Sequence, residues 1–539
     1  MNKVEAHGRV PEVPEGFSAS QGALAVGNVV DVVVVGAGHN GLVAAARLSE
    51  AGFSVLVVEE KAVVGGAVRT EAPFPKVPGL RTSTGAYLLG LMPPEIVAGL
   101  GLQIPLIRRD PHYFLPTTGR GYLLLGSDAP STNAQLRAFF SERDVRASVA
   151  LTTELASLRE DIAATWLDEP LTIEGTAERW VRPALRSIFV DLCRKPISDY
   201  LARFGFESDR LQAMYAVTDA FSGLTGTWDT PGTGMNFLIH NMCRLPGSDG
   251  TWMIVKGGMG TVTDELRRAA ETRGARIEVN AGVSEILVEH GAATGVCLSD
   301  GRHVRARTVV VNADPFRMRG MLGRDRLPED YNARLDGYLR DGTTLKVNLA
   351  LSGLPRFTCL PEPVGQHGTT IHLLPENDVI AELGRAFRDA TSGRLPRFPA
   401  IEWYIHTSVD ASLKDDRGHH NSALFVQWVP YDIAGSTWEA EEEGYVRHLL
   451  SVCDRFAPGT SELVVDRFTL HPRRIEEHFG MTRGHIHHVD NTFGFSDRLP
   501  VTTPIAGLYS ASAACHPGGS VIGAAGWIAA KRVQRDLAL

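Results

Sequence analysis

The stretch VVVVGAGHNG, residues 32–41, decides the fold class of this 539-residue chain. Its four valines form a β-branched run without polar alternation, which is typical of a strand covered on both faces in a parallel sheet. Residues 42–48 follow with strong helix formers, and Gly52 provides a helix stop. Residues 55–58 are again apolar and β-branched. The order strand, turn, helix, strand predicts a βαβ unit that opens an α/β fold.

The turn itself has the spacing G-x-G-x-x-G, formed by Gly36, Gly38 and Gly41. The first glycine permits the tight turn, the second lets the backbone approach a pyrophosphate, and the third lets the helix pack on the strand. His39 and Asn40 lie at the start of the following helix, where free N–H groups and the helix dipole stabilise an anion. In this setting the motif predicts dinucleotide binding.

An acidic residue at the end of the second strand completes this pattern. Glu59 is placed to accept hydrogen bonds from a ribose, and its neighbour Glu60 remains the alternative for that role. Lys61 follows directly and belongs to the same predicted cofactor site.

A second glycine pair favours FAD over NAD. Gly65 and Gly66 give another close approach of the backbone, and Arg69 is able to contact a diphosphate. Thr70 ends this run.

The run from Gly65 to Thr70 resembles the FAD signature of the phytoene-desaturase-like branch of the FAD-dependent amine oxidase superfamily. Residues 507–509 and 515–526 resemble the closing flavin-binding segment of that family, so the resemblance covers nearly the whole chain. Residues 344–348 and 427–431 are also similar to the relatives called pyridine nucleotide-disulphide oxidoreductase domain-containing protein 2. The resemblance implies a discontinuous Rossmann-like FAD-binding domain of the glutathione-reductase-like type with an α+β substrate-binding cap.

The resemblance also implies further cofactor contacts. Val283 should offer backbone hydrogen bonds to the adenine, and Gly258 and Tyr87 should lie near the flavin ring. For Tyr87, a core aromatic with a satisfied hydroxyl is an equal alternative. Ser512 occupies a segment where many relatives have an acidic residue or glycine, and its hydroxyl is a candidate substitute.

The end of the chain should face the isoalloxazine ring. Residues 517–519 read as a turn, and Ser520 reads as the N-cap of a helix that runs to Arg532. Positive potential at this helix start would stabilise reduced flavin. Gly519 and Val521 belong to the same predicted contact, and an ordinary packed helix is the alternative.

A second βα-rich block covers residues 257–279. Between it and the first block, and again from about residue 321 to 500, the sequence changes to mixed helices and strands, which predicts a cap built from two insertions. The predicted segments are a flexible tail (1–27), FAD-binding parts (28–105, 251–320 and 500–539) and substrate or cap parts (106–250 and 321–499). In the second FAD-binding part, Asp300-Gly301 favours a type I′ hairpin turn between residues 294–298 and 303–311.

Composition excludes several function classes. A net charge of −8 gives no attraction for a phosphate backbone, so nucleic acid is not an expected partner. The six cysteines include no C-x-x-C pair, which favours a reduced, cytoplasmic chain without a zinc knuckle. No apolar run is long enough to span a bilayer, although peripheral membrane contact remains open, and oligomeric state is not encoded in any pattern we recognise.

His516 is the leading catalytic candidate, because it lies in the segment expected to line the ring and titrates near neutrality. A histidine that only bonds the backbone of the turn is the alternative. His485, His487 and His488, if on one strand, give too few ligands for a metal, so no metal is expected. Lys346 on an apolar strand is interpreted as a snorkelling surface lysine in preference to a residue facing the flavin.

These patterns together predict an FAD-dependent oxidoreductase that removes hydride from a C–H bond of a small, largely apolar substrate, with O2 or a quinone reoxidising the flavin. A flavin-dependent amine oxidase, a flavin-dependent isomerase and a non-catalytic binding protein with the fold of Rab GDP-dissociation inhibitors remain alternatives.

Overall fold

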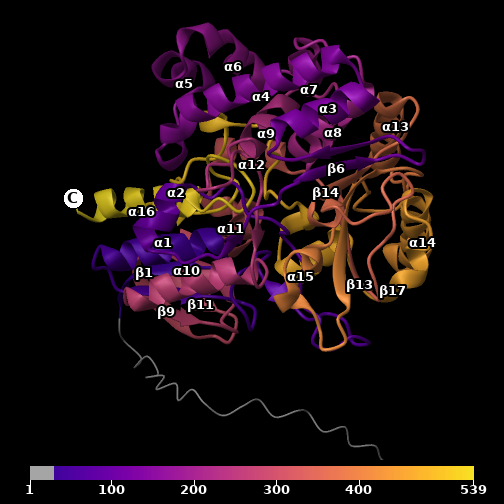
Figure 1. Ribbon diagram of the computed structural model, residues 1–539. Coiled ribbons are helices and arrows are strands. Elements are labelled where there is room, and N and C mark those ends of the chain that lie inside the picture. Colours follow the sequence, from indigo (N-terminus) through magenta and orange to yellow (C-terminus); the bar gives the residue numbers. More distant parts are fainter. Residues whose placement is uncertain (1–28, 539) are drawn as a thin grey trace, which may run out of the picture.

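The computed structural model describes residues 29–538, so the predicted tail (1–27) lies outside the described residues. Two seven-stranded sheets organise the chain (Figure 1). The first has the order β10-β11-β12-β1-β2-β9, with β18 beside β12. Its strands are β1 (Val30–Val35), β2 (Val55–Val58), β9 (Arg276–Glu278), β10 (Val283–Glu289), β11 (Ala292–Leu298), β12 (His303–Val311) and β18 (Leu508–Ser510).

The strand β1 lies at the centre of this first sheet. It pairs in parallel with β2 on one side, with Val33 opposite Leu56, and with β12 on the other, with Val33 opposite Val309. Val32, Val33 and Val34 are fully buried, which confirms a strand covered on both faces. The helices α1 (His39–Glu50), α10 (Gly260–Thr272) and α16 (Ala524–Leu537) share one apolar cluster on one face. The predicted βαβ opening is thus present.

The second sheet has the order β17-β13-β16-β15-β14-β6-β7 and draws strands from both sides of the segment that contributes β9 to β12. Its strands are β6 (Tyr113–Pro116), β7 (Tyr122–Leu125), β13 (Thr344–Leu351), β14 (Thr370–Leu373), β15 (Ala400–Tyr404), β16 (His420–Gln427) and β17 (Val464–Leu470). Two small ribbons pair β3 (Thr70–Glu71) with β4 (Thr82–Ser83), and β5 (Leu106–Ile107) with β8 (Ile254–Val255). The exact limits between the predicted domain segments remain predictions.

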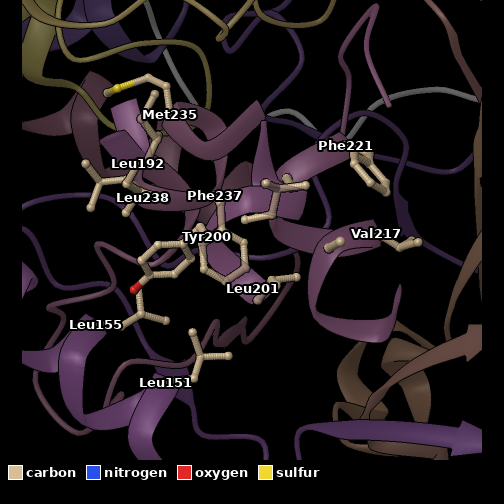
Figure 2. Packing of buried hydrophobic residues seen from close by; sticks show 14 of the residues in the cluster. Leu151, Leu155, Leu192, Tyr200, Leu201, Val217, Phe221, Met235, Phe237 and Leu238 are labelled. Atoms are coloured by element: carbon tan, nitrogen blue, oxygen red, sulfur yellow. The ribbon is translucent and has the colours of Figure 1, made fainter. Parts of the chain in front are cut away.

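A helical layer covers the upper part of the molecule in Figure 1. Its core is apolar: Leu151 and Leu155 of α4, Tyr200 of α7 and Phe237 of α9 gather in one cluster (Figure 2). The remaining helices are α2 (Pro94–Leu100), α3 (Ala129–Phe139), α4 (Glu142–Ile162), α5 (Ile173–Trp180), α6 (Arg186–Arg194), α7 (Ile197–Ala202), α8 (Asp209–Ala216), α9 (Thr233–His240), α11 (Pro315–Leu322), α12 (Glu329–Tyr338), α13 (Val379–Thr391), α14 (Trp438–Phe456) and α15 (Pro472–Phe479).

The C-terminal helix begins later than predicted. α16 starts at Ala524, and Gly523, with a φ of 83°, is its N-cap, so Ser520 does not cap it. The cause lies in Asn491, whose Oδ1 accepts the Gly519 N–H at 2.9 Å and whose Nδ2 donates to the Gly519 carbonyl at 3.1 Å. Because a side chain satisfies this backbone, residues 520–523 need no helical hydrogen bonds. The helix also ends later than predicted, at Leu537 instead of Arg532.

The hairpin between β11 and β12 is present, but its turn is not type I′. Gly301 has a φ of 86°, whereas Asp300 does not have a positive φ. Asp300 Oδ1 instead accepts the Arg302 N–H at 3.0 Å, which stabilises the turn through a side chain.

Gly526→Ala should destabilise the protein, because a Cβ at this position would overlap the Asn40 carbonyl oxygen at the contact between α16 and α1. Overpacking of this kind costs roughly 1–3 kcal/mol. Gly444→Ala is the matched control, since Gly444 lies inside α14 with open space around it and the change should stabilise by about 1 kcal/mol. Thermal melts test both, and a Tm for Gly526→Ala at or above that of the parent protein would contradict the packing argument.

Candidate active site

One cavity extends from the glycine-rich turn to the second sheet, with an empty volume of about 1840 Å³ that includes its open mouth. Most of the predicted cofactor residues line it. They are Gly36, Gly38, His39, Asn40, Glu59, Glu60, Lys61, Gly65, Gly66, Arg69, Tyr87, Val283, Ser520 and Val521. The predicted residues Gly41, Thr70, Gly258, Ser512, Gly519 and His516 do not line it.

The glycine-rich turn has no room for side chains. Gly36 adopts a φ of 95°, and a Cβ on Gly41 would overlap the Gly36 carbonyl oxygen. A Cβ on Gly38 would lie 2.6 Å from Nδ2 of Asn312, which follows β12 and approaches the Gly36 carbonyl at 3.4 Å. The turn therefore presents bare backbone to the cavity at the start of α1, as anion binding requires.

Glu59 supports this turn from the neighbouring strand. Its Oε2 accepts the Ala37 N–H at 2.7 Å, and its Oε1 accepts the Lys61 N–H at 3.0 Å. Burial raises the pKa of the Glu59 carboxyl. Each carboxylate oxygen can accept a second hydrogen bond, so Glu59 can hold the turn and still receive ribose hydroxyls.

Glu60 lies on the same cavity wall but is already paired. Its carboxylate lies 2.6 Å from Arg317 Nη2 and 3.5 Å from Lys61 Nζ. The hydrogen bond from Arg317 lowers the pKa of Glu60. Between the two carboxylates, the geometry favours Glu59 for the ribose.

The run after the second glycine pair links separate parts of the chain. Thr70 Oγ1 accepts the Gly260 N–H at 2.9 Å and donates to the Gly257 carbonyl at 3.3 Å. A Cβ on Gly258 would overlap Thr70 Oγ1. Thr70 and Gly258 thus fasten the start of α10 beside the cavity without lining it.

Arg69 remains in the cavity wall. Its guanidinium lies 5.0 Å from the Phe479 ring centroid, and its Nη2 donates to the His478 carbonyl at 3.3 Å. Its Nε forms an ion pair with Glu71 Oε1 at 3.4 Å, without a hydrogen bond of good geometry among the described residues.

Two further polar atoms at the turn are buried without partners in the part of the chain that the structure describes, namely His39 Nε2 and Asn40 Oδ1. Burial lowers the pKa of His39 to about 4, so its ring is neutral at pH 7. Unpaired buried polar atoms are costly, and their presence beside a side-chain-free turn fits a polar group such as the FAD diphosphate and ribityl chain.

Arg498 holds the closing segment in place, a role that the sequence reading missed. Its fully buried guanidinium donates to the carbonyls of Ala513, at 2.9 Å, and Cys515, at 3.1 Å, and to Phe493, at 3.0 Å. Ser512 lies in the same segment, where its Oγ accepts the Ala514 N–H at 3.1 Å and pairs with His488 Nδ1 at 2.9 Å. The Ser512 hydroxyl is therefore engaged with the protein.

His516 lies behind the cavity wall. Its Nε2 donates to the Thr165 carbonyl at 3.2 Å, and its ring packs between Trp166 and Phe495. Burial lowers the pKa of His516 to about 3. This placement supports the alternative of a backbone-bonding histidine and argues against a general base.

Lys346 lies on β13 and faces the cavity, so the preference for a surface lysine was wrong. It is 5% exposed, and its Nζ lies 4.2 Å from the Tyr87 ring centroid and 4.3 Å from that of Phe425. Tyr87 itself is a cavity residue whose hydroxyl has no partner among the described residues. Aromatic faces stabilise an ammonium but offer it no hydrogen-bond acceptor of full strength.

A buried carboxyl lies near this lysine. Glu402 on β15 lines the cavity and accepts a hydrogen bond from the Tyr404 hydroxyl. Burial raises the pKa of Glu402 to about 7 and lowers that of Lys346 to about 7. Two such groups beside one cavity are a candidate for proton transfer.

The three histidines of residues 485–488 lie in a turn and not on a strand, because the Arg483 φ of 54° and the His488 φ of 64° break the extended path. Of them, His487 and His488 line the cavity. No group of three His, Cys, Asp or Glu side chains within residues 29–538 is arranged to hold a metal ion.

The chain matches the family described as flavin containing amine oxidoreductase over residues 41–534. The chain belongs to this family. FAD is accordingly its cofactor, it is an FAD-dependent oxidoreductase, and the predicted fold class is confirmed.

Individual proteins are similar to this chain in sequence or fold. The mouse (Mus musculus) pyridine nucleotide-disulfide oxidoreductase domain-containing protein 2 is 34% identical, over 94% of each chain. Hydroxyneurosporene desaturase of Cereibacter sphaeroides is 31% identical over 56% of this chain and 60% of its own. A double mutant of putrescine oxidase has the same fold, with a TM-score of 0.60, 18% identity and coverage of 94% and 99%. None of the described helices is both long and apolar enough to cross a membrane.

Glu59→Ala should weaken FAD binding by roughly 1.5–3 kcal/mol, because it removes a charged acceptor for the ribose and for the Ala37 N–H. Fluorescence titration of FAD into flavin-free protein measures the change in Kd. Glu60→Ala is the control, and its effect should be smaller because Arg317 already pairs with that carboxylate. A larger loss for Glu60→Ala would move the ribose role to Glu60.

Proposed function

We propose that this flavoenzyme removes a hydride from a C–H bond of a small, largely apolar substrate, and that a second hydrogen leaves as a proton to Lys346. The observation that carries this proposal is one continuous cavity, since it joins the glycine-rich turn, where FAD binds in this family, to a buried lysine whose Nζ lies over the rings of Tyr87 and Phe425. A bound substrate would lie between the two.

We call the end of the cavity beside the second sheet the cap end. Its walls favour an apolar substrate body. Leu88, Trp252, Phe425 and Ile486 line it beside Tyr87. Such walls exclude water and strengthen the electrostatic interactions inside. The relative named hydroxyneurosporene desaturase supports hydrogen removal as the reaction class.

The chemistry divides between cofactor and protein. Bound FAD supplies the acceptor for the hydride, that is, for the electron pair of the broken C–H bond. The neutral amine of Lys346 accepts the proton from the neighbouring atom, and the substrate gains a double bond between the two atoms. Glu402 is placed to compensate the charge on Lys346, because burial gives the two groups similar pKa values near 7. Reoxidation by O2 or a quinone then completes the cycle.

Anaerobic mixing of the yellow holoprotein with a panel of alkenes, alcohols and amines tests the proposal. A substrate should bleach the flavin spectrum, and admission of O2 or a quinone should restore it. Product formation without bleaching would indicate isomerisation instead. Colourless protein that took up no added FAD would contradict the proposal.

Lys346→Met should slow substrate-dependent bleaching by about 10² to 10⁴, the usual contribution of a positioned acid or base, without changing FAD affinity. The bleaching rate of the parent protein should rise as the pH passes through about 7, because the amine must be neutral to accept a proton. Stopped-flow absorbance across the pH range measures both. Lys195→Met, at an exposed position paired with Asp191, should keep the parent rate and profile. An unchanged profile in Lys346→Met would remove Lys346 from the mechanism.

A further inference from the structure

Two buried histidines at the cap end of the cavity each use only one ring nitrogen. His240 ends α9, and its Nδ1 lies 3.0 Å from the Thr218 carbonyl oxygen. His487 lies in the turn after η9 (Thr482–Gly484), and its Nε2 lies 2.8 Å from the Ser222 carbonyl oxygen. Both line the cavity, with exposed fractions of 5% and 4%.

The carbonyl partners fix the tautomer of each ring. A carbonyl oxygen only accepts hydrogen bonds, so the nitrogen that faces it carries the proton. Burial lowers the pKa of His240 to about 4 and that of His487 to about 3, so both rings are neutral at pH 7. The remaining nitrogens, His240 Nε2 and His487 Nδ1, are therefore lone-pair acceptors, and neither has a partner within residues 29–538.

A matching donor lies beside them. The centre of the His240 ring lies 5.5 Å from that of Trp252 and 6.2 Å from that of His487. Trp252 also lines the cavity. Trp252 Nε1 is a donor only and likewise has no partner in the described structure. Two acceptors and one donor, all buried and without partners in the described chain, thus belong to three residues that line one end of the cavity.

The charge at this end opposes a cation. Arg109 is 2% exposed and donates to Thr370 Oγ1 at 2.7 Å and to the Trp252 carbonyl at 2.9 Å. The pKa values of Lys346 and Glu402, both about 7, give this pair no net negative charge at pH 7 to offset Arg109. Burial raises the pKa of Asp219 to about 8, so this acid adds no full negative charge at pH 7. An ammonium group would therefore be repelled here.

We propose that His240, His487 and Trp252 form a binding site for a neutral hydroxyl group, so that the substrate is a hydroxylated molecule with an otherwise apolar body. A hydroxyl donates its one hydrogen bond to the Nε2 lone pair of His240, whose ring lies beside Trp252, and accepts one from the Trp252 N–H. An ether satisfies only the tryptophan, and a hydrocarbon satisfies neither. The inference rests on the proposed function only in placing the substrate at this end of the cavity.

Binding to the oxidised holoprotein tests the site without turnover. The probes are n-octanol, heptyl methyl ether and n-octylamine, which have equal numbers of heavy atoms, and the measurement is the perturbation of the flavin absorbance spectrum at pH 7. We expect n-octanol to bind at least about tenfold more tightly than the ether, because the ether leaves both imidazoles unpaired. We expect n-octylamine, which is protonated at this pH, to bind more weakly than n-octanol.

Variants then assign the preference to the site. His240→Phe should abolish the advantage of n-octanol over the ether, and His240→Gln, whose amide oxygen also accepts, should restore part of it. His367→Phe is the matched control, since His367 is also buried and bonds a backbone carbonyl, that of Pro355 at 2.8 Å, but does not line the cavity. It should keep the full preference.

Four results would overturn the inference: equal affinity for alcohol and ether, a preference that survives in His240→Phe, tightest binding of the amine, or no binding of any probe. Binding of n-octanol with the predicted preference, but without bleaching by any alcohol, would instead count against the proposed hydride removal and leave the hydroxyl site standing.

Discussion

The contact between α1 and α16 is the constraint on which the cofactor site depends. At Gly526 the backbone of α16 comes so close to the Asn40 carbonyl that a methyl group would not fit. Asn40 belongs to the glycine-rich turn, whereas Ala513, Ser520 and Val521, which also line the cavity, lie on the segment that leads into α16. The starts of α1 and α16 must therefore pack closely together before one dinucleotide can contact both.

Side-chain hydrogen bonds set that register where regular secondary structure does not. Residues 511–523 contain no helix, so their carbonyls need other donors. Arg498 supplies these donors from a buried position, and Asn491 satisfies both backbone groups of Gly519. Burial of an arginine is costly unless every N–H is paired, and here the partners are the carbonyls that the segment would otherwise leave unpaired. These hydrogen bonds therefore satisfy both the buried side chains of Arg498 and Asn491 and the buried backbone groups of the segment.

Local patterns were enough to predict the first sheet and the class of cofactor. The valine run, the glycine spacing and the alanine-rich helix are each encoded in a few consecutive residues, although Val33 pairs across the sheet with Leu56 and with the distant Val309. Asn312 was missed as a cavity residue, although its place directly after β12 was a usable signal, because ligands in α/β folds bind beyond the carboxyl ends of strands.

The substrate end could not be predicted in the same way. Lys346, Glu402 and His240 come from β13, β15 and α9, and no sequence spacing relates them. A lysine between apolar residues on a strand is compatible with either face, so only the tertiary packing decided that it points inward. For His516 the converse holds: neighbouring residues of its segment line the cavity, whereas its own ring packs against Trp166.

The cap end therefore combines two features. Its walls are apolar and aromatic, as expected for a greasy substrate, yet it also contains a buried lysine, a buried carboxyl and two neutral imidazoles with free lone pairs. The free nitrogens of the two imidazoles lower stability while nothing pairs with them, and a purely hydrocarbon ligand would leave both unpaired. A protein that keeps so many unpaired polar atoms around one cavity is built for a ligand that pairs with them. These unpaired groups lower the free energy of unfolding, but they also make the cavity selective. A ligand without the matching hydroxyl leaves the buried polar groups desolvated and unpaired, so it binds more weakly than the hydroxylated ligand.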